Sequence, residues 1–434
     1  MNLSKMNSSS NGAWGQVIQV GNVSFGAFIT GLYLFCWFVQ INSRVSILEI
    51  VRFEFTLGVL CILCSIPRVF QSSSKVFDAK FIAPVSLYVF VITLYVIFSM
   101  DVDRSLDIYI DRFVKFSIVA ILVSVNVRSV DDLKCILYFM LLAWLRLGYE
   151  SSVGWLTGSL VWQNQGIMRL HGSTTNYAHP NSLAGFSVTS LIFGVFFYRF
   201  VDSRLVKWLS AFLILFSVIG IVFSGSRTGY VATFITSIFM VKNLNLGVNK
   251  LIVLFVIVFT ALVSFVPVDY YERVGTIFTQ EEKAGRSTEK RIEILEDAWF
   301  VFKAHPLGVG VGAFPSVRNT YFGRSQDTHN LYLELLTNIG VLGFLIFLWL
   351  IFRIYKLATR LQGLYEADKT PNGRFLYALI LSLKGYLIAR LALGCFGMDL
   401  YEIYWWVVLG FVAACNTKFS DCLNQNSTML SGAR

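Results

Sequence analysis

Apolar residues occur in long runs that short polar segments separate. Twelve runs stand out, at about 23–41, 47–66, 81–100, 113–127, 133–147, 182–200, 205–223, 230–241, 251–266, 331–354, 375–396 and 400–414. A helix needs about 20 residues to cross the hydrocarbon core of a bilayer, and several runs are shorter than that. The sequence therefore predicts an all-α integral membrane protein with about 11–12 transmembrane helices.

The polar segments between the runs predict the organisation of the chain. We expect a cytoplasmic tail over 1–22, transmembrane helices 1–9 over 23–266, a large outer loop over 267–328, helices 10–12 over 329–416 and a cytoplasmic tail over 417–434. The first 20 residues are polar and rich in Ser and Asn, which is not the pattern of a cleaved signal peptide. The large loop contains an expected amphipathic helix, 287–304, with Ser287 as its N-cap. Long ordered loops usually bind ligands or carry chemistry.

Composition excludes several other classes of protein. The 434 residues are 56% hydrophobic and 14% charged, with a mean hydropathy of +0.64, whereas soluble domains are about 25% charged. The net charge of +10 follows from loops rich in Lys and Arg on the side assigned to the cytoplasm, as the positive-inside rule requires. We therefore expect a lipid bilayer as surroundings, both termini in the cytoplasm, and no nucleic acid as partner.

A short turn between two runs has the sequence SGSRTG at 224–229. Gly225 and Gly229 permit tight turns and close backbone approach. Arg227 has no acid near it in sequence, and its planar guanidinium could grip a phosphate with two hydrogen bonds. The alternative is an arginine that extends to the membrane interface without binding a ligand.

The expected loop helix carries a basic group of Arg286, Lys290 and Arg291. Arg291 shares a helix face with Leu295, Ala298 and Phe302, the face that we expect to pack downward. A cation on an otherwise apolar face needs an anionic partner. That partner is either a ligand or an acid of the protein, which could be Glu293, Glu296 or another acid.

His329 stands where the large loop returns to an apolar run. With an ordinary pKa near 6.5, a histidine is the natural general base at neutral pH. Asn330 could orient it. The alternative is a histidine that only caps the helix at the interface. His305, which precedes a proline, is interpreted as a structural cap.

A second polar loop contains His171, Asn176, His179 and Asn181, with Arg169 just before them. Asn, Ser and Thr side chains are typical sugar-binding groups, and Arg169 could add a phosphate contact. Two histidines eight residues apart lack the third ligand that a metal site needs.

Three other features bear on metal and nucleotide binding. Asp101 and Asp103 form a D-x-D pair that could hold a divalent cation or could be a solvated acidic loop. The chain has no Walker-type sequence for binding ATP. A dinucleotide site would require its glycines to follow a strand, and the glycines at 308–312 follow none.

Few charges lie within the apolar runs. One of them, Arg390, is expected either to pair with Asp399 or Glu402 or to line a cavity.

Taken in order, these groups resemble the O-antigen polymerase and O-antigen ligase superfamily of bacterial membrane glycosyltransferases. The resemblance rests on SGSRTG at 224–229, on Arg291, Ala298 and Trp299 with AHPLGVG at 304–310, and on His329-Asn330 followed by Gly340 and Gly343. The last group fits the signature H-N-x9-G-x-x-G. AHPNSLA at 178–184 also looks like the loop that precedes a span in this family.

The resemblance implies a GT-C-like helical bundle in the bacterial inner membrane, with the large loop in the periplasm. The substrate that it implies is a glycan linked to undecaprenyl pyrophosphate, with no metal and no cofactor. On this interpretation His329, Arg227 and Arg291 are catalytic. The substrate-binding residues are Asn330, Arg169, His179, Asn181 and Arg286.

Three functions remain open at this point. A polymerase joins lipid-linked repeat units for O-antigen or exopolysaccharide, with a chain-length regulator and a flippase as possible partners. A ligase transfers the finished polymer to lipid A core. An exporter moves glycan without chemistry, but it predicts charges along the spans, whereas here they cluster at one face. We favour the polymerase as the commoner role.

Overall fold

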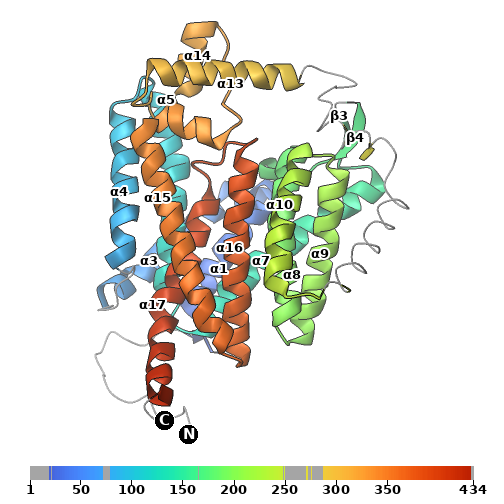
Figure 1. Cartoon of the computed structure of the whole chain (residues 1–434), viewed down its shortest axis with the longest axis vertical. Coiled ribbons are helices and arrows are strands. Elements are labelled where there is room, and N and C mark those ends of the chain that lie inside the picture. The colour runs from blue at the N-terminus through green and yellow to red at the C-terminus, as the bar shows by residue number, and fades with distance from the viewer. Residues whose placement is uncertain are drawn as a thin grey trace.

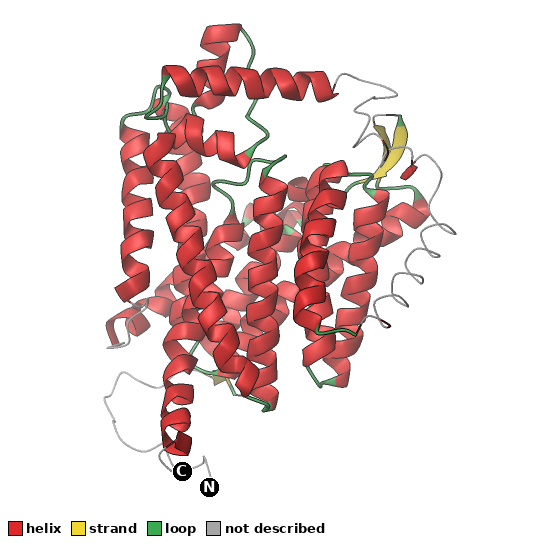
Figure 2. Cartoon of the chain, viewed as in Figure 1, coloured by secondary structure: helices red, strands yellow, loops and turns green. Residues whose placement is uncertain are grey.

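The computed structural model describes residues 19–20, 22–71, 79–164, 166–247, 249, 270–271, 275 and 287–431. These residues form a bundle of long helices with two short strand pairs (Figures 1 and 2). Within the described residues, four helices are long and apolar enough to cross a membrane, namely α8 (Pro180–Phe200), α9 (Arg204–Phe223), α15 (Leu331–Ala367) and α16 (Pro371–Gly394). The predicted fold class, an all-α membrane protein, is confirmed.

Every predicted apolar run within the described residues corresponds to helical structure. The remaining helices along the bundle are α1 (Phe25–Val39), α2 (Ser46–Ile50), α3 (Phe53–Gln71), α4 (Ala79–Ile97), α5 (Val102–Ile108), α6 (Lys115–Asn126), α7 (Val130–Thr157), α10 (Arg227–Leu244) and α17 (Ile403–Ser431). The run at 47–66 is divided between α2 and α3, because Arg52 adopts a left-handed conformation with φ of 46°. The run at 251–266 lies outside the described residues.

Short elements connect these helices. They are the pair β1 (Gln19–Val20) and β2 (Val23–Ser24), the pair β3 (Val161–Asn164) and β4 (Ile167–Leu170), the 3-10 helices η2 (Ile41–Arg44) and η4 (Thr175–Tyr177), and the π-helix η3 (Tyr109–Val114). In the second pair, Val161 lies opposite Leu170 and Asn164 lies opposite Ile167.

Helix caps and burial follow from the local sequence. Ser129 and Asp132 form a capping box at the start of α7, and Ser226 accepts a hydrogen bond from the backbone of Gly229 at the start of α10. These contacts satisfy backbone donors that a helix start leaves free. In the most apolar stretch of α16, 89% of the residues are buried, whereas in that of α9 only 28% are buried. Thus α16 belongs to the core of the bundle, and α9 lies at its surface.

Two helices of the large loop lie beyond the end of the bundle. α13 (Ser287–Ala304) crosses above the long helices, and α14 (Phe314–Phe322) lies over it (Figure 1). The bounds of α13 agree with the predicted helix, although Ser287 is its first helical residue rather than its cap. Its buried face contains Ile294, Ala298 and Val301. The predicted packing face was wrong for Leu295, which is 36% exposed, and α14 was not predicted.

Candidate functional site

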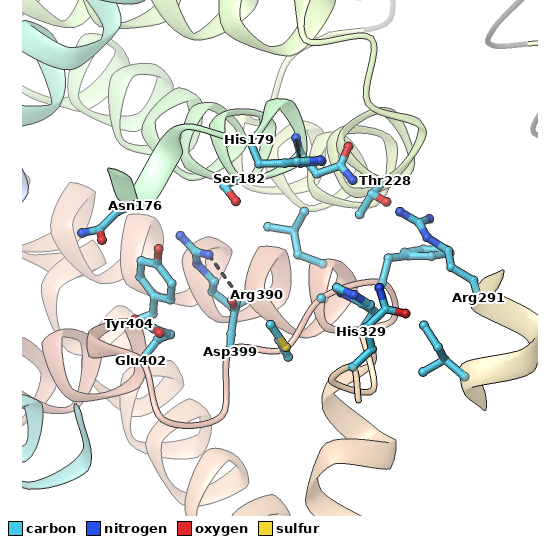
Figure 3. A pocket seen from close by; sticks show the side chains of 18 of the residues that line it. Asn176, His179, Ser182, Thr228, Arg291, His329, Arg390, Asp399, Glu402 and Tyr404 are labelled. Atoms are coloured by element: carbon cyan, nitrogen blue, oxygen red, sulfur yellow. Dashed lines mark hydrogen bonds and ion pairs between the residues drawn. The ribbon is translucent and has the colours of Figure 1, made fainter. Parts of the chain in front are cut away.

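A cavity of about 570 Å³ opens at the α13 end of the bundle. Figure 3 shows its walls, to which the loop before α15 and helices α8, α10, α13, α16 and α17 all contribute. The polar and charged residues that line it are Arg112, Asn176, His179, Asn181, Ser182, Thr228, Lys290, Arg291, Gln326, His329, Arg390, Asp399, Glu402 and Tyr404. Segments distant in sequence therefore meet in one polar site.

His329 lies on the cavity wall, directly before α15. Its φ is 49°, a left-handed conformation that few residues other than glycine adopt. Asn330 is the N-cap of α15. Its side-chain oxygen accepts from the backbone nitrogens of Tyr332 and Leu333, both at 3.0 Å, and its side-chain nitrogen donates to the Cys395 carbonyl. The amide of Asn330 is thus used to hold the helix start, and so the residue before it.

The environment of His329 favours its neutral form. Burial disfavours the charged ring, and the positive charge of Arg291 acts in the same direction, so the pKa of His329 lies below its usual value of 6.5. The negative charge of Asp327 opposes this shift without cancelling it. At neutral pH the imidazole therefore has a free nitrogen that can accept a proton.

Arg291 and Lys290 reach the cavity from α13. Of the acids that the sequence offered as partners of Arg291, Glu293 pairs with Arg324. Arg291 is half-buried and lies beside His329 (Figure 3). This side of the cavity therefore combines two cations with a neutral histidine.

The start of α8 forms a second wall. The ring of His179 caps this helix by accepting from the backbone nitrogen of Asn181 at 3.1 Å. Enclosure in the wall lowers the pKa of His179 to about 4, and the positive charges of Arg169 and Arg291 add to the effect. Asn181 and His179 line the cavity as separate hydrogen-bonding groups.

Arg169 lies behind this wall rather than on it. It is 1% exposed, donates from Nε to the carbonyl oxygen of Ser224 at 2.7 Å, and donates from Nη2 to Oδ1 of Asn181 at 2.8 Å. It therefore ties the turn after α9 to the start of α8. The structure gives it a structural contact, not a place in the lining.

The turn at 224–229 joins α9 to α10 as the sequence predicts. Gly225 has φ of 56°, and a Cβ on Gly229 would lie 2.7 Å from that of Ala184, so both glycines are needed for the turn and the packing. Thr228 lines the cavity, and Arg227, half-buried, begins α10 one residue earlier. Arg286 lies outside the described residues.

The opposite side of the cavity is built from α16 and α17. Arg390 donates to Asp399 at 3.1 Å, and its guanidinium carbon lies 3.3 Å from the centre of the Tyr404 ring. Glu402 accepts from Arg112 at 3.0 Å. Both alternatives given for Arg390 hold, because it forms an ion pair and also lines the cavity.

Asp101 and Asp103 lie away from this cavity, in a shallower depression beside His305. Asp101 caps α5, accepting from the backbone nitrogen of Arg104 at 3.2 Å, and also accepts from the hydroxyl of Ser316. Among the described residues, no group of three or more His, Cys, Asp and Glu side chains is placed to hold a metal.

Sequence reasoning missed part of the lining. Ser182 and Thr228 adjoin predicted residues, so proximity in sequence could have found them, whereas Asn176 was singled out in the polar loop by the sequence itself. Tyr404 and Gln326 carry no such signal, because a tyrosine at a helix start and a glutamine in a loop are common structural residues. Only the folded chain brings them to the cavity.

One family model matches part of the chain. Residues 211–348 match the model described as O-antigen ligase, and no curated protein matches the sequence. The matched segment contains Arg227, Arg291 and His329. The α8 wall and the α16–α17 side of the cavity lie outside it.

Proposed function

We propose that the chain, whose residues 211–348 match the family model described as O-antigen ligase, transfers a glycan from an undecaprenyl-pyrophosphate donor to a sugar hydroxyl. The observation that carries this proposal is the cavity in which Arg291 and His329 lie together. The lowered pKa of His329 favours the neutral form that a base requires. A glycosyl transfer of this kind needs a base for the acceptor and cations for the leaving pyrophosphate.

The proposed reaction uses these groups in one displacement. His329 takes the proton of the acceptor hydroxyl as its oxygen attacks the anomeric carbon of the donor. The bond between that carbon and the phosphate oxygen breaks with inversion, and the electron pair leaves on undecaprenyl pyrophosphate. Arg291 and Arg227 bind the pyrophosphate as its negative charge grows.

For the other predicted residues we propose supporting roles. His179 and Asn181 offer hydrogen bonds to the substrate from the α8 wall, while Arg169 and Asn330 fix the positions of Asn181 and His329. Arg286, on the segment before α13, remains a candidate for a phosphate contact.

We propose that the acceptor is a second lipid-linked repeat unit, so that the reaction polymerises O-antigen or exopolysaccharide. The description of the matching family as O-antigen ligase supports the second candidate, in which the acceptor is a lipid A core sugar. An exporter is less well supported, since the two basic residues within the apolar run 375–396 are used internally: Lys384 donates to Gln362 at 2.6 Å and Arg390 pairs with Asp399.

The proposed location is the bacterial inner membrane, with the cavity and the loop 267–328 on the periplasmic side. Both termini then lie in the cytoplasm, in keeping with the basic loops at that face. A flippase that delivers lipid-linked repeats and a chain-length regulator are the expected partners of such an enzyme.

A glycan ladder gel of a deletion strain tests the proposal. Loss of a polymerase leaves lipid A capped with a single repeat, or removes secreted polymer while lipid A is unchanged. Loss of a ligase leaves polymer on undecaprenyl pyrophosphate. A deletion strain with unchanged glycans and no accumulated lipid-linked glycan would contradict glycan transfer altogether.

A further inference from the structure

The two sides of the cavity differ in charge. Arg291 and Lys290 lie on the His329 side, where no carboxylate is among the described residues that line the cavity. On the other side two carboxylates line the cavity: Asp399 pairs with Arg390, and Glu402 pairs with Arg112. Figure 3 shows Arg291 and His329 well apart from Asn176, Tyr404 and Glu402.

The α16–α17 side has the chemistry of a sugar site. A sugar hydroxyl both donates and accepts hydrogen bonds, and the carbon face of a sugar ring is apolar. Carboxylates accept, guanidinium groups donate, and an amide does both. Asn176, Arg390, Asp399 and Glu402 supply all of these groups, and Tyr404 supplies an aromatic ring.

Arg390 and Asp399 are held in place by several contacts. The guanidinium of Arg390 is fixed by the Tyr404 ring and by Asp399, and the residue is 5% exposed. The indole nitrogen of Trp405 donates to the backbone carbonyl of Asp399 at 2.7 Å, which fixes the turn that carries Asp399. Preorganised polar groups lose little entropy when a ligand binds.

The buried ion pair on the α16–α17 side contributes little to the stability of the fold. Burying an ion pair is rarely better for stability than an apolar contact. In addition, Nε of Arg390 is buried with no hydrogen-bond acceptor among the described residues, and such unsatisfied donors are rare in natural proteins. Ligand recognition explains why an ion pair of this kind lines a cavity.

We propose that Asn176, Arg390, Asp399, Glu402 and Tyr404 form a subsite for the sugar residues of the glycan, separate from the pyrophosphate site at Arg291. This inference rests on the proposed function. It assigns glycan recognition to residues outside 211–348, the segment that matches the family model. Glu402 and Asn176 are then specificity-determining residues rather than catalytic ones.

Two lipid probes test the subsite with the purified full chain. The first is undecaprenyl pyrophosphate without sugar, and the second is the lipid-linked repeat unit extracted from the deletion strain. For Glu402→Gln and Asn176→Ala, we expect about tenfold weaker binding of the second probe, the effect of losing one good hydrogen bond. Binding of the first probe should stay unchanged.

Controls separate this inference from the proposed function. Arg291→Ala should weaken both probes, and Asp103→Asn, an exposed acid outside this cavity, should weaken neither. Arg390→Lys, which keeps the charge but loses the planar fork, should behave like Glu402→Gln. Thermal melting of each variant checks that it is folded.

Equal weakening of both probes by the Glu402 and Asn176 variants, or no weakening of either, overturns the sugar subsite. If wild-type protein binds neither probe, or Arg291→Ala leaves the first probe unaffected, the proposed pyrophosphate site is wrong instead. Loss of binding to the glycosylated lipid alone supports the subsite.

Discussion

The backbone nitrogen of Val309 donates a hydrogen bond of 2.8 Å to the carbonyl oxygen of Thr337. Two more backbone bonds continue this contact, from Gly310 to Asn338 at 2.9 Å and from Val341 to Pro306 at 3.1 Å. The turn between α13 and α14 is thereby joined to α15, about two helical turns from His329. The contact is possible because α15 is kinked at Gly340, where φ is 61° and ψ is −172°.

We expect Gly340→Ala to destabilise the protein by at least about 1–3 kcal/mol, the usual cost of such a backbone conformation in other residues. A Cβ there would also lie 2.3 Å from the carbonyl carbon of Leu307. Thermal melting in detergent measures the effect, and activity should fall as the turn separates from α15.

Gly363→Ala is the matched control in the same helix. Gly363 is exposed, and a Cβ there would meet nothing within 4 Å. Because alanine favours a helix over glycine by about 1 kcal/mol, the melting temperature should stay the same or rise. Similar losses in both variants would show that the kink is not the cause.

A substitution that respects the backbone isolates the chemistry of His329. Asparagine adopts left-handed φ values readily, but it has no basic nitrogen. We expect His329→Asn to keep the melting temperature while polymer is lost and lipid-linked repeat units accumulate. General base catalysis contributes about 10²–10⁴-fold, so a glycan ladder of normal length from this variant would rule out His329 as the base.

The pH dependence of the reaction follows from the lowered pKa of His329. The neutral base persists at pH values where an ordinary histidine, with a pKa of 6.5, is already protonated. The rate at low substrate should therefore fall to half of its plateau at a pH below 6.5. A half-maximal rate at pH 6.5 or above would contradict a lowered pKa.

The sequence predicted the spans and α13 because hydrophobic runs and helix periodicity are local properties. It also singled out His329 and Arg291, which lie together on the cavity wall. The roles of Arg169 and Asn330 depend on partners far along the chain, Ser224 and Cys395. No local pattern distinguishes such contacts from ligand binding.

The kink at Gly340 and the sugar side of the cavity were beyond prediction for the same reason. Gly340 fits the family signature, but its need for a positive φ comes from Leu307 in the loop above it. Tyr404 is one aromatic among 19 tyrosines in the sequence. Its stacking on Arg390 arises only when α16 packs beside α17.

The D-x-D pair gives a prediction about metal. Asp101 already accepts hydrogen bonds from the Ser316 hydroxyl and from the backbone nitrogen of Arg104 at the start of α5. The hydrogen bond from Ser316 is the main reason why the pKa of Asp101 lies below its usual value. We expect EDTA and Asp103→Asn to leave the transfer rate unchanged, whereas Asp101→Ala loses a helix cap, at a cost of about 1 kcal/mol. Restoration of an EDTA-inhibited reaction by a divalent cation would reverse this assignment.

A buried ion network holds α13 in place, and its removal gives the last prediction. Asp297, 5% exposed, accepts from Nε of Arg318 at 2.8 Å and from Arg324 at 2.9 and 2.8 Å. Asp297→Asn leaves the charge of Arg318, itself 1% exposed, without its anion. Breaking one partner of such a pair costs about 3–5 kcal/mol.

We therefore expect the loop to become sensitive to protease in Asp297→Asn and the transfer rate to fall, because Arg291 is carried by the same helix. Glu293→Gln is the matched control, since Glu293 also pairs with Arg324 but its own side chain is 44% exposed. An exposed pair contributes about 0–1 kcal/mol, so this variant should resist protease like the wild type. Equal sensitivity of the two variants would place the stabilising contact in the Arg324 pairs rather than in the buried bond between Asp297 and Arg318.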